Sequence, residues 1–354
     1  MDRPRRCARA SAPGDWGESM SPVGAPQVLR DRCRAIASSG RRCRNHAVDE
    51  RGFCRVHAGP PRHLQHAAPD RRSPEALFEE RVRGLIDFAR RRLLGDYEVD
   101  EFGFDRELTE TILHPIAMLM YNHYWRVTTI GIENVPATGP ALLVANHSGT
   151  VPWDAAMMKF GLLGEHPARR HVRLLAADLA VSMPFMSHLA RKTGNTVAIE
   201  EDSLRLLKAG ELVGVFPEGY KGVGKPFAQR YRLQRFGRGG FVTLALKAKV
   251  PVIPVAIVGA EEIYPMIGNL KGLARLLGFP YFPVTPLFPA LGPLGAIPLP
   301  SKWMIEYGEP IQMDSYGEDA FEDAMLVFDL TDRIRDTIQQ MLNRNLAARS
   351  GAFF

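Results

Sequence analysis

Short apolar runs alternate with amphipathic segments along most of this 354-residue chain. Continuous apolar runs of strand length are typical of strands buried on both faces. They predict strands at residues 126–130, 141–145, 172–176, 196–199, 212–216, 252–258 and 304–307. Helical spacing of apolar residues between them predicts helices at residues 153–163, 185–192, 201–209, 239–247 and 321–346. Strands that alternate with helices predict an α/β fold, with a mostly parallel central sheet and helices on both faces.

A helical segment is expected before this α/β region. Ser73 is a typical N-cap and Pro74 a typical first helical residue, so a helix should begin there. A second helix is expected over residues 108–125, with a kink near Pro115. Its surface is apolar around much of its circumference, which fits either burial in the core or contact with a membrane interface.

Composition divides the chain into parts. The first residues are rich in Pro, Gly, Ser and Ala and have few apolar anchors, so they are expected to be disordered. The expected parts are a disordered basic tail (1–30), a small zinc module (31–60), a linker (61–72) and a main domain (73–346), which comprises a helical lead-in (73–125), an α/β core (126–315) and a C-terminal helix (321–346).

The net charge of +6 is confined to the N-terminal part. Residues 1–72 hold 15 arginines, no lysine and 7 acidic residues, whereas the remainder has a net charge of about −2. Nucleic-acid contact is therefore expected only through the N-terminal module. No apolar run reaches the ~18 residues of a membrane-spanning helix, and the N-terminus lacks the apolar core of a secretory signal. We expect a cytoplasmic protein.

Three of the four cysteines lie close together in the arginine-rich segment. Cys33, Cys43, Cys54 and His57 have the spacing Cys-x9-Cys-x10-Cys-x2-His. Three thiolates and an imidazole can form a tetrahedral zinc site, and the metal would supply folding energy that so short a span lacks. The stretch also resembles a small Cys3His module found attached to varied proteins. The alternative is an unstructured arginine-rich tail with scattered cysteines.

A histidine and a carboxylate follow the predicted strand 141–145. The sequence of residues 146–154 is Asn-His-Ser-Gly-Thr-Val-Pro-Trp-Asp. His147 is thus expected at the carboxyl end of a strand, where α/β sheets bind their ligands. A neutral imidazole can take a proton from an alcohol, and Asp154 can fix its tautomer and stabilise the imidazolium. Alternatively, Asp154 only stabilises a helix N-terminus and His147 is an ordinary loop residue.

A second strand end carries a carboxylate and a basic loop. The predicted strand 212–216 runs into a Pro-Glu-Gly turn, which is followed by a glycine-rich loop with Lys221 and Lys225. Such a loop at the carboxyl edge of a sheet suits an anionic group such as a phosphate. The alternatives are an ordinary turn and a solvated basic face.

Three blocks, taken in order, resemble the glycerolipid (lysophospholipid) acyltransferase family, whose type member makes phosphatidic acid. The resemblance covers about residues 95–315. The matching blocks are Asn146-His147-Ser148 with Asp154, then Phe216-Pro217-Glu218-Gly219, then Val250 to Pro254.

The resemblance implies an O-acyltransferase without a catalytic cofactor. His147 would be the general base on a hydroxyl of a lysophospholipid or lysophosphatidic acid, and Asp154 would orient it. Acyl-CoA or acyl carrier protein would be the donor, without a covalent acyl-enzyme. An amide near Gly149 is a candidate oxyanion donor. The protein would bind peripherally to the inner face of the cell membrane. The candidate acceptor-binding residues are Phe216, Pro217, Glu218, Gly219, Lys221 and Lys225.

Two departures from the family pattern affect the acceptor. Six residues separate His147 from Asp154, where the usual motif has four, and this longer form is similar to monoacylglycerol and diacylglycerol acyltransferase-like proteins. The block that normally carries a phosphate-binding arginine ends here in Glu200. A neutral mono- or diacylglycerol is therefore an alternative acceptor. A hydrolase and a non-catalytic zinc-dependent binding protein are alternatives of other classes.

Residues 279–300 combine aromatic and aliphatic side chains with many prolines. Little regular structure is expected there. Such a segment can line an acyl-chain channel, enter a bilayer interface or cover the core as a packed loop.

Overall fold

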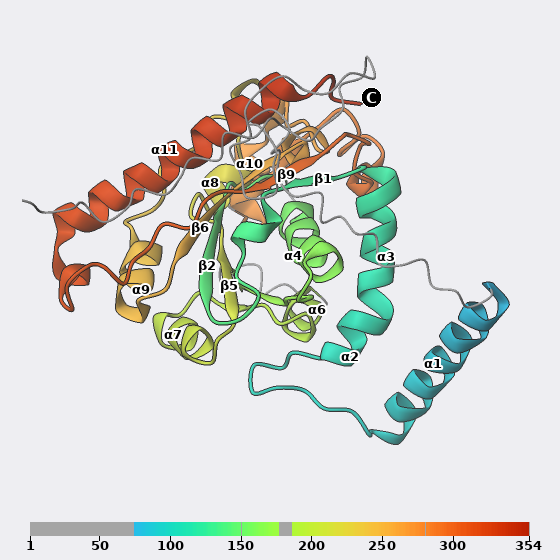
Figure 1. Ribbon diagram of the computed structural model, residues 1–354. Coiled ribbons are helices and arrows are strands. Elements are labelled where there is room, and N and C mark those ends of the chain that lie inside the picture. The colour runs from blue at the N-terminus through green and yellow to red at the C-terminus, as the bar shows by residue number, and fades with distance from the viewer. Residues whose placement is uncertain (1–73, 150, 177–185, 280, 354) are drawn as a thin grey trace, which may run out of the picture. The chain divides into compact units, whose positions relative to one another are not determined.

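A computed structural model describes residues 74–149, 151–176, 186–279 and 281–353 (Figure 1). The chain divides into two units, Met1–Leu77 and Phe78–Phe354, and the fold below is that of the second. The expected tail, zinc module and linker lie outside the described residues, together with Cys33, Cys43, Cys54 and His57.

Seven strands form one sheet in the order β1-β9-β6-β2-β5-β3-β4. The strands are β1 (Thr128–Ile130), β2 (Ala141–Ala145), β3 (Val172–Ala176), β4 (Thr196–Val197), β5 (Leu212–Val215), β6 (Val252–Val258) and β9 (Met304–Tyr307). From β6 to β4 all neighbours are parallel, whereas β9 pairs antiparallel with β6 and carries β1 parallel to itself. The predicted mostly parallel sheet is confirmed.

Helices cover both faces of this sheet, as predicted. Alternate side chains of β2 point to opposite layers, because successive residues of a strand face opposite sides. Leu143 packs with α4 and the helical segment before β1, whereas Leu142 and Val144 pack with α7, α9 and α11 (Figure 1). The main helices along the described chain are α1 (Pro74–Leu94), α3 (His114–Leu119), α4 (Trp153–Glu165), α6 (Met186–Lys192), α7 (Glu200–Lys208), α9 (Gly240–Ala248) and α11 (Ala324–Ala348). Of these, α1 contributes no residue to the two core clusters.

The second lead-in helix is helical from Arg106 to Tyr124 but changes its winding. It consists of α2 (Arg106–Leu108), a π-helical turn (Thr109–Leu113), α3 and a second π-helical turn (Met120–Tyr124). The first widened turn ends at Leu113, two residues before Pro115, whose ring and missing N–H disturb regular helical bonding. Tyr121 is buried while Leu119 is exposed, so the helix is only partly a core element.

The observed start of two elements differs from the predicted start, and a single residue explains each difference. The first strand begins at Thr128, two residues later than predicted, because Arg126 has a left-handed backbone (φ 46°) that interrupts extended structure. The last helix begins at Ala324, because the Asp323 side chain accepts hydrogen bonds from the amides of Met325 and Leu326 and caps it.

The carboxyl ends of β2, β5 and β6 meet at one edge of the sheet. β2 lies between β5 and β6 and is parallel to both. The chain leaves β2 for α4 on one face, and it leaves β5 for α9 on the other. Loops that diverge in this way form the crevice in which open α/β sheets bind ligands.

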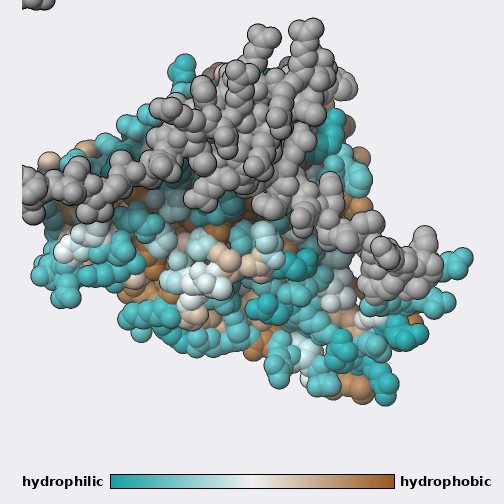
Figure 2. Space-filling view, in the orientation of Figure 1, coloured by the Kyte–Doolittle hydropathy of each residue, from teal (hydrophilic) through white to brown (hydrophobic). Residues whose placement is uncertain are grey.

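No described helix is both long enough and apolar enough to cross a membrane. On the face shown in Figure 2, the described residues are mainly hydrophilic, with smaller hydrophobic patches between them.

Candidate active site

The ring of His147 is paired with Asp154. His147 lies in the loop after β2, and its Nδ1 is 2.7 Å from Oδ2 of Asp154. Asp154 lies in the first turn of α4 and is fully buried, and its two oxygens also accept from the amides of Ser148 and Ala155, each at 2.8 Å. A carboxylate can only accept, so Nδ1 donates this hydrogen bond, and in a neutral imidazole Nε2 then keeps its lone pair.

The start of this loop is fixed by Asn146. Its buried side chain accepts from the amide of Ile257 at 2.7 Å and donates to the carbonyl of the same residue at 3.0 Å. The amide side chain thus extends the pairing of β2 with β6 by one further position. Gly149 then turns the chain with φ +77°, a conformation that side chains other than glycine rarely adopt.

The loop after β5 contacts His147 from the other side. The Phe216 ring lies 4.6 Å from the His147 ring, centroid to centroid. Glu218 is buried, and its oxygens accept from the amides of His147 at 3.1 Å and Gln234 at 2.6 Å. Gly219 follows with φ 55° and ψ −145°, which only glycine adopts readily. Glu218 therefore binds the backbone of the loop that carries the histidine.

Lys225 lies between two buried carboxylates. Its Nζ is 3.3 Å from Oε2 of Glu218 and 3.0 Å from Oε1 of Glu261, and it donates to the carbonyl of Arg232. Burial raises the pKa of Glu261 to about 7, although Lys225 and the amide of Tyr231 act in the opposite direction. With two carboxylates beside it, Lys225 is not a free cation for an anionic ligand.

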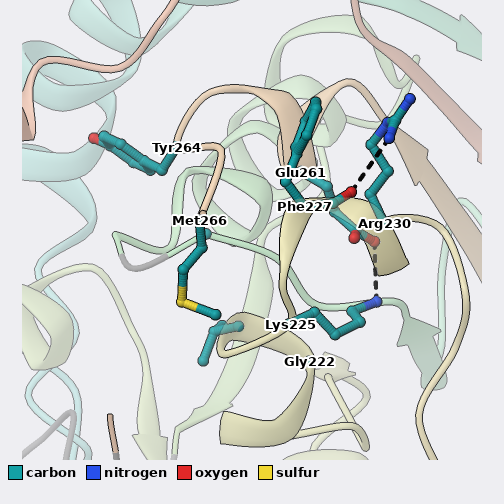
Figure 3. A pocket seen from close by; sticks show the side chains of 9 residues that line it. Gly222, Lys225, Phe227, Arg230, Glu261, Tyr264 and Met266 are labelled. Atoms are coloured by element: carbon teal, nitrogen blue, oxygen red, sulfur yellow. Dashed lines mark hydrogen bonds and ion pairs between the residues drawn. The ribbon is translucent and has the colours of Figure 1, made fainter. Parts of the chain in front are cut away.

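A small hollow lies beside the His147 loop (Figure 3). Its space for water-sized groups is about 20 Å³, which is room for roughly one water molecule. In Figure 3, Lys225 and Glu261 point toward each other on one side, and Tyr264 and Met266 lie on another. The lining residues are Gly149, Gly222, Val223, Lys225, Phe227, Arg230, Glu261, Tyr264 and Met266.

Gly222 lines this hollow and also packs against the backbone of His147. A Cβ added to Gly222 would lie 3.0 Å from the carbonyl oxygen of His147 and 2.8 Å from the Glu218 Cβ. Only a residue without a side chain allows the short helix α8 (Tyr220–Val223) to pack this closely against the loop.

The structure brings His147, Asp154, Phe216 and Glu218 into direct contact. It places Gly149 and Lys225 in the wall of the hollow, whereas Lys221 is exposed. The expected roles of these residues in binding an acceptor stay predictions, as do those of Pro217 and Gly219.

Two contributing residues, Gly222 and Glu261, were not predicted as site residues. The sequence offers one signal for Glu261, which follows the end of β6 as His147 follows the end of β2.

No group of three or more His, Cys, Asp or Glu side chains suited to a metal ion occurs among the residues that the structure describes. The predicted zinc ligands Cys33, Cys43, Cys54 and His57 are not among those residues, so the zinc module stays a prediction.

Known proteins are similar to this chain in sequence. The family model "Acyltransferase" matches residues 126–258. An uncharacterized protein of Mycobacterium tuberculosis is 53% identical over 273 residues, which cover 77% of this chain and 76% of that protein. A Bos taurus protein called "DGAT1/2-independent enzyme synthesizing storage lipids" is 24% identical over 61% of this chain and 58% of its own length.

Among solved structures, the 1-acyl-sn-glycerophosphate (LPA) acyltransferase PlsC from Thermotoga maritima is similar. It has a TM-score of 0.45 and 19% sequence identity, and the match covers 68% of this chain and 82% of that one. The family model spans β1 to β6 together with His147, Asp154 and Glu218, and by this match the chain belongs to the acyltransferase family.

Proposed function

We propose that the protein transfers a fatty acyl group from an acyl thioester to a hydroxyl group of a glycerolipid, with His147 as the general base. The observation that carries this proposal is the His147–Asp154 pair, with no described residue hydrogen-bonded to Nε2 and with a hollow that reaches the same loop at Gly149. Acyl-CoA or acyl carrier protein supplies the thioester, which is the donor expected for this family.

The proposed step needs no residue beyond those in contact. Nε2 of His147 takes the proton of the acceptor hydroxyl as the hydroxyl oxygen attacks the thioester carbonyl carbon. Asp154 accepts from Nδ1 and stabilises the imidazolium that forms. The tetrahedral intermediate then loses its C–S bond, and the imidazolium returns the proton to the leaving thiolate. The products are an ester and a free thiol.

Gly149 is the proposed donor to the developing oxyanion. It lines the hollow, and its amide donates to no other described residue. A backbone amide aimed at such a charge is worth about 10²–10³ in rate in comparable sites. Glu218 is proposed to position the His147 backbone, because both of its oxygens already accept from amides.

Two classes of acceptor remain candidates, and different observations favour each. Arg230 lines the hollow and has no carboxylate partner among the described residues, which favours a phosphorylated acceptor such as lysophosphatidic acid or another lysophospholipid. The neutralised Lys225 and the storage-lipid synthesis named for the bovine relative favour a mono- or diacylglycerol.

Purified protein supplied with labelled long-chain acyl-CoA and one acceptor at a time tests the proposal. The acceptors are lysophosphatidic acid, lysophospholipids, monoacylglycerol, diacylglycerol and water alone, and the labelled lipids are separated. We expect a labelled ester with at least one lipid acceptor. Release of free fatty acid at an equal rate in every sample would indicate a hydrolase, and no turnover with any donor or acceptor would contradict catalysis.

A further inference from the structure

The connection from β6 to β9, defined here as residues 263–303, leaves the sheet next to the hollow. It contains a two-stranded sheet, β7 (Gly268–Asn269) with β8 (Pro283–Val284), and the helix α10 (Lys271–Leu276). Hydrogen bonds from the Leu299 amide to the Ile263 carbonyl and from the Tyr264 hydroxyl to the Ala296 carbonyl join its two ends. Tyr264 and Met266 line the hollow, so the connection begins in its wall.

Exposed apolar side chains form one group on this connection, and a second group lies on residues 82–99. Of the 25 large apolar side chains that are exposed among the described residues, nine lie between residues 267 and 297. Leu276 is 81% exposed, Ile267 67% and Leu294 63%. The nine are Ile267, Leu270, Leu273, Leu276, Leu277, Phe279, Leu291, Leu294 and Ile297. A concentration of this kind is typical of a surface that contacts a partner or a membrane.

The charge of the same segment has one sign. Between Glu262 and Glu306 the chain has three basic residues and no acidic one. Lys271 and Arg275, both on α10, are exposed and have no ion-pair partner among the described residues. An apolar surface with cations and no carboxylate is complementary to an anionic lipid surface, where apolar side chains enter the interface and cations meet phosphates.

We propose that residues 267–297 dock the enzyme on a bilayer that contains anionic lipids, with the mouth of the hollow at the bilayer surface. The inference rests on the proposed function only in that the substrates are lipids. An acidic carrier protein is the less suitable partner, because the surface has far more apolar side chains than cations.

Depth-dependent quenching tests this surface directly. The variants Leu276→Trp and Leu294→Trp place a fluorophore on the connection, and Phe328→Trp places one at an exposed position of α11 as a matched control. Vesicles of phosphatidylcholine and phosphatidylglycerol, with brominated chains as quencher, are added to each full-length variant. We expect quenching and a blue shift for the two connection variants above the wild-type background. Equal signals for Phe328→Trp, or none for either connection variant, would overturn the proposal.

Vesicle affinity provides a second, independent measurement. The triple variant Ile267→Ser, Leu276→Ser, Leu294→Ser should bind these vesicles at least roughly a hundredfold more weakly, because each buried aliphatic side chain is worth on the order of a tenfold change. The double variant Met325→Ser, Phe328→Ser on α11 should bind as the wild type does. An unchanged affinity in the triple variant would contradict the docking surface.

Two further outcomes would also overturn the proposal that residues 267–297 dock on a bilayer. Light scattering that shows a dimer lost in the triple variant would identify the surface as an interface between copies of the chain. Binding to acyl carrier protein that depends on these residues, without vesicle binding, would identify a protein partner. Vesicle binding does not require turnover, so loss of the proposed acyl transfer in the acceptor panel leaves this test intact.

Discussion

The His147 loop is held from two sides by buried carboxylates that act in different ways. On the α4 side, Asp154 bonds to the imidazole ring, and its other partners are the amides of Ser148 and Ala155 and the Ser148 hydroxyl. On the α8 side, Glu218 bonds to the backbone of His147 and is paired with Lys225, which also meets Glu261. Asp154 is expected to set the protonation of the His147 ring, and Glu218 is expected to set the position of its backbone. Substitutions of the two carboxylates should therefore have different effects on activity and stability.

The largest effect is expected on the α4 side. In Asp154→Asn, the amide has one acceptor oxygen and cannot satisfy the ring and both backbone amides together. We expect kcat to fall about 10²–10⁴-fold with little change in the KM of the acceptor. Steady-state kinetics would measure this, with Asp323→Asn at the N-cap of α11 as a control that should be active. A kcat within threefold of the wild type would contradict the role of Asp154.

A smaller loss of rate is expected on the α8 side. Glu218→Ala leaves the amides of His147 and Gln234 without acceptors, which costs about 1–3 kcal/mol of folding free energy for each buried amide. We expect kcat to fall by roughly 10–100-fold, because a displaced base loses its alignment. The pH profile of kcat should keep its shape, because the ring pair is intact.

Denaturant unfolding and the pH profile together distinguish the two sides. Glu200→Ala is the control, since Glu200 is exposed and, among the described residues, is ion-paired only with Lys247. A Glu218→Ala variant of wild-type stability, or one with a shifted pH profile, would show that the two carboxylates do not divide their roles in this way.

Gly222→Ala tests the close packing of α8 on the loop without changing any charge. The added Cβ would lie 3.0 Å from the His147 carbonyl oxygen, so the backbone must move by a few tenths of an ångström. We expect about a tenfold lower kcat. Gly240→Ala, where a Cβ would meet nothing within 4 Å, should have wild-type kinetics, and equal kinetics for both variants would refute the steric account.

The smallest expected effect is on the pH dependence of stability, and it comes from Glu261, which contacts Lys225. Burial raises the pKa of Glu261 from an ordinary value of 4.5 to about 7. Between these two pH values, the Glu261 carboxyl keeps its proton in the folded protein but has lost it in the unfolded chain. The contribution of this group to stability is therefore full below about pH 4.5 and is lost as the pH rises to about 7. Unfolding curves at pH 5, 6, 7 and 8 should show a shallower pH dependence for Glu261→Gln than for the wild type. Parallel curves would mean that Glu261 does not titrate in this range.

Most of the sheet could be predicted because each main strand is a continuous apolar run in the sequence. The five apolar residues of β2 and the seven of β6, with Pro254 included, are buried without exception, so a continuous apolar run was sufficient evidence for each. The exact ends of other elements depended on the conformation or side chain of a single residue. The left-handed backbone of Arg126 and the cap of Asp323 moved two boundaries, and apolar spacing carries no information on either.

The predictable part of the site is the part that is close in sequence. His147 and Asp154 are seven residues apart and flank one strand-to-helix turn, so their contact follows from local structure. Lys225 and Glu261 are 36 residues apart, and they meet because β5 and β6 flank β2 in parallel, so that the loops after both strands lie at the same edge of the sheet. The sequence indicated a basic loop at Lys225 but could not show that its ammonium group is already bound by Glu218 and Glu261.

Acyl transfer by His147→Ala tests the central claim most directly. The rate of ester formation from labelled acyl-CoA and the best acceptor of the panel would be measured for this variant and the wild type, with thermal unfolding to confirm the fold. We predict a rate lower by about 10²–10⁴-fold at unchanged melting temperature, which is the usual contribution of a general base. A folded His147→Ala variant that forms the ester within a few-fold of the wild-type rate would contradict the assignment of His147 as the base.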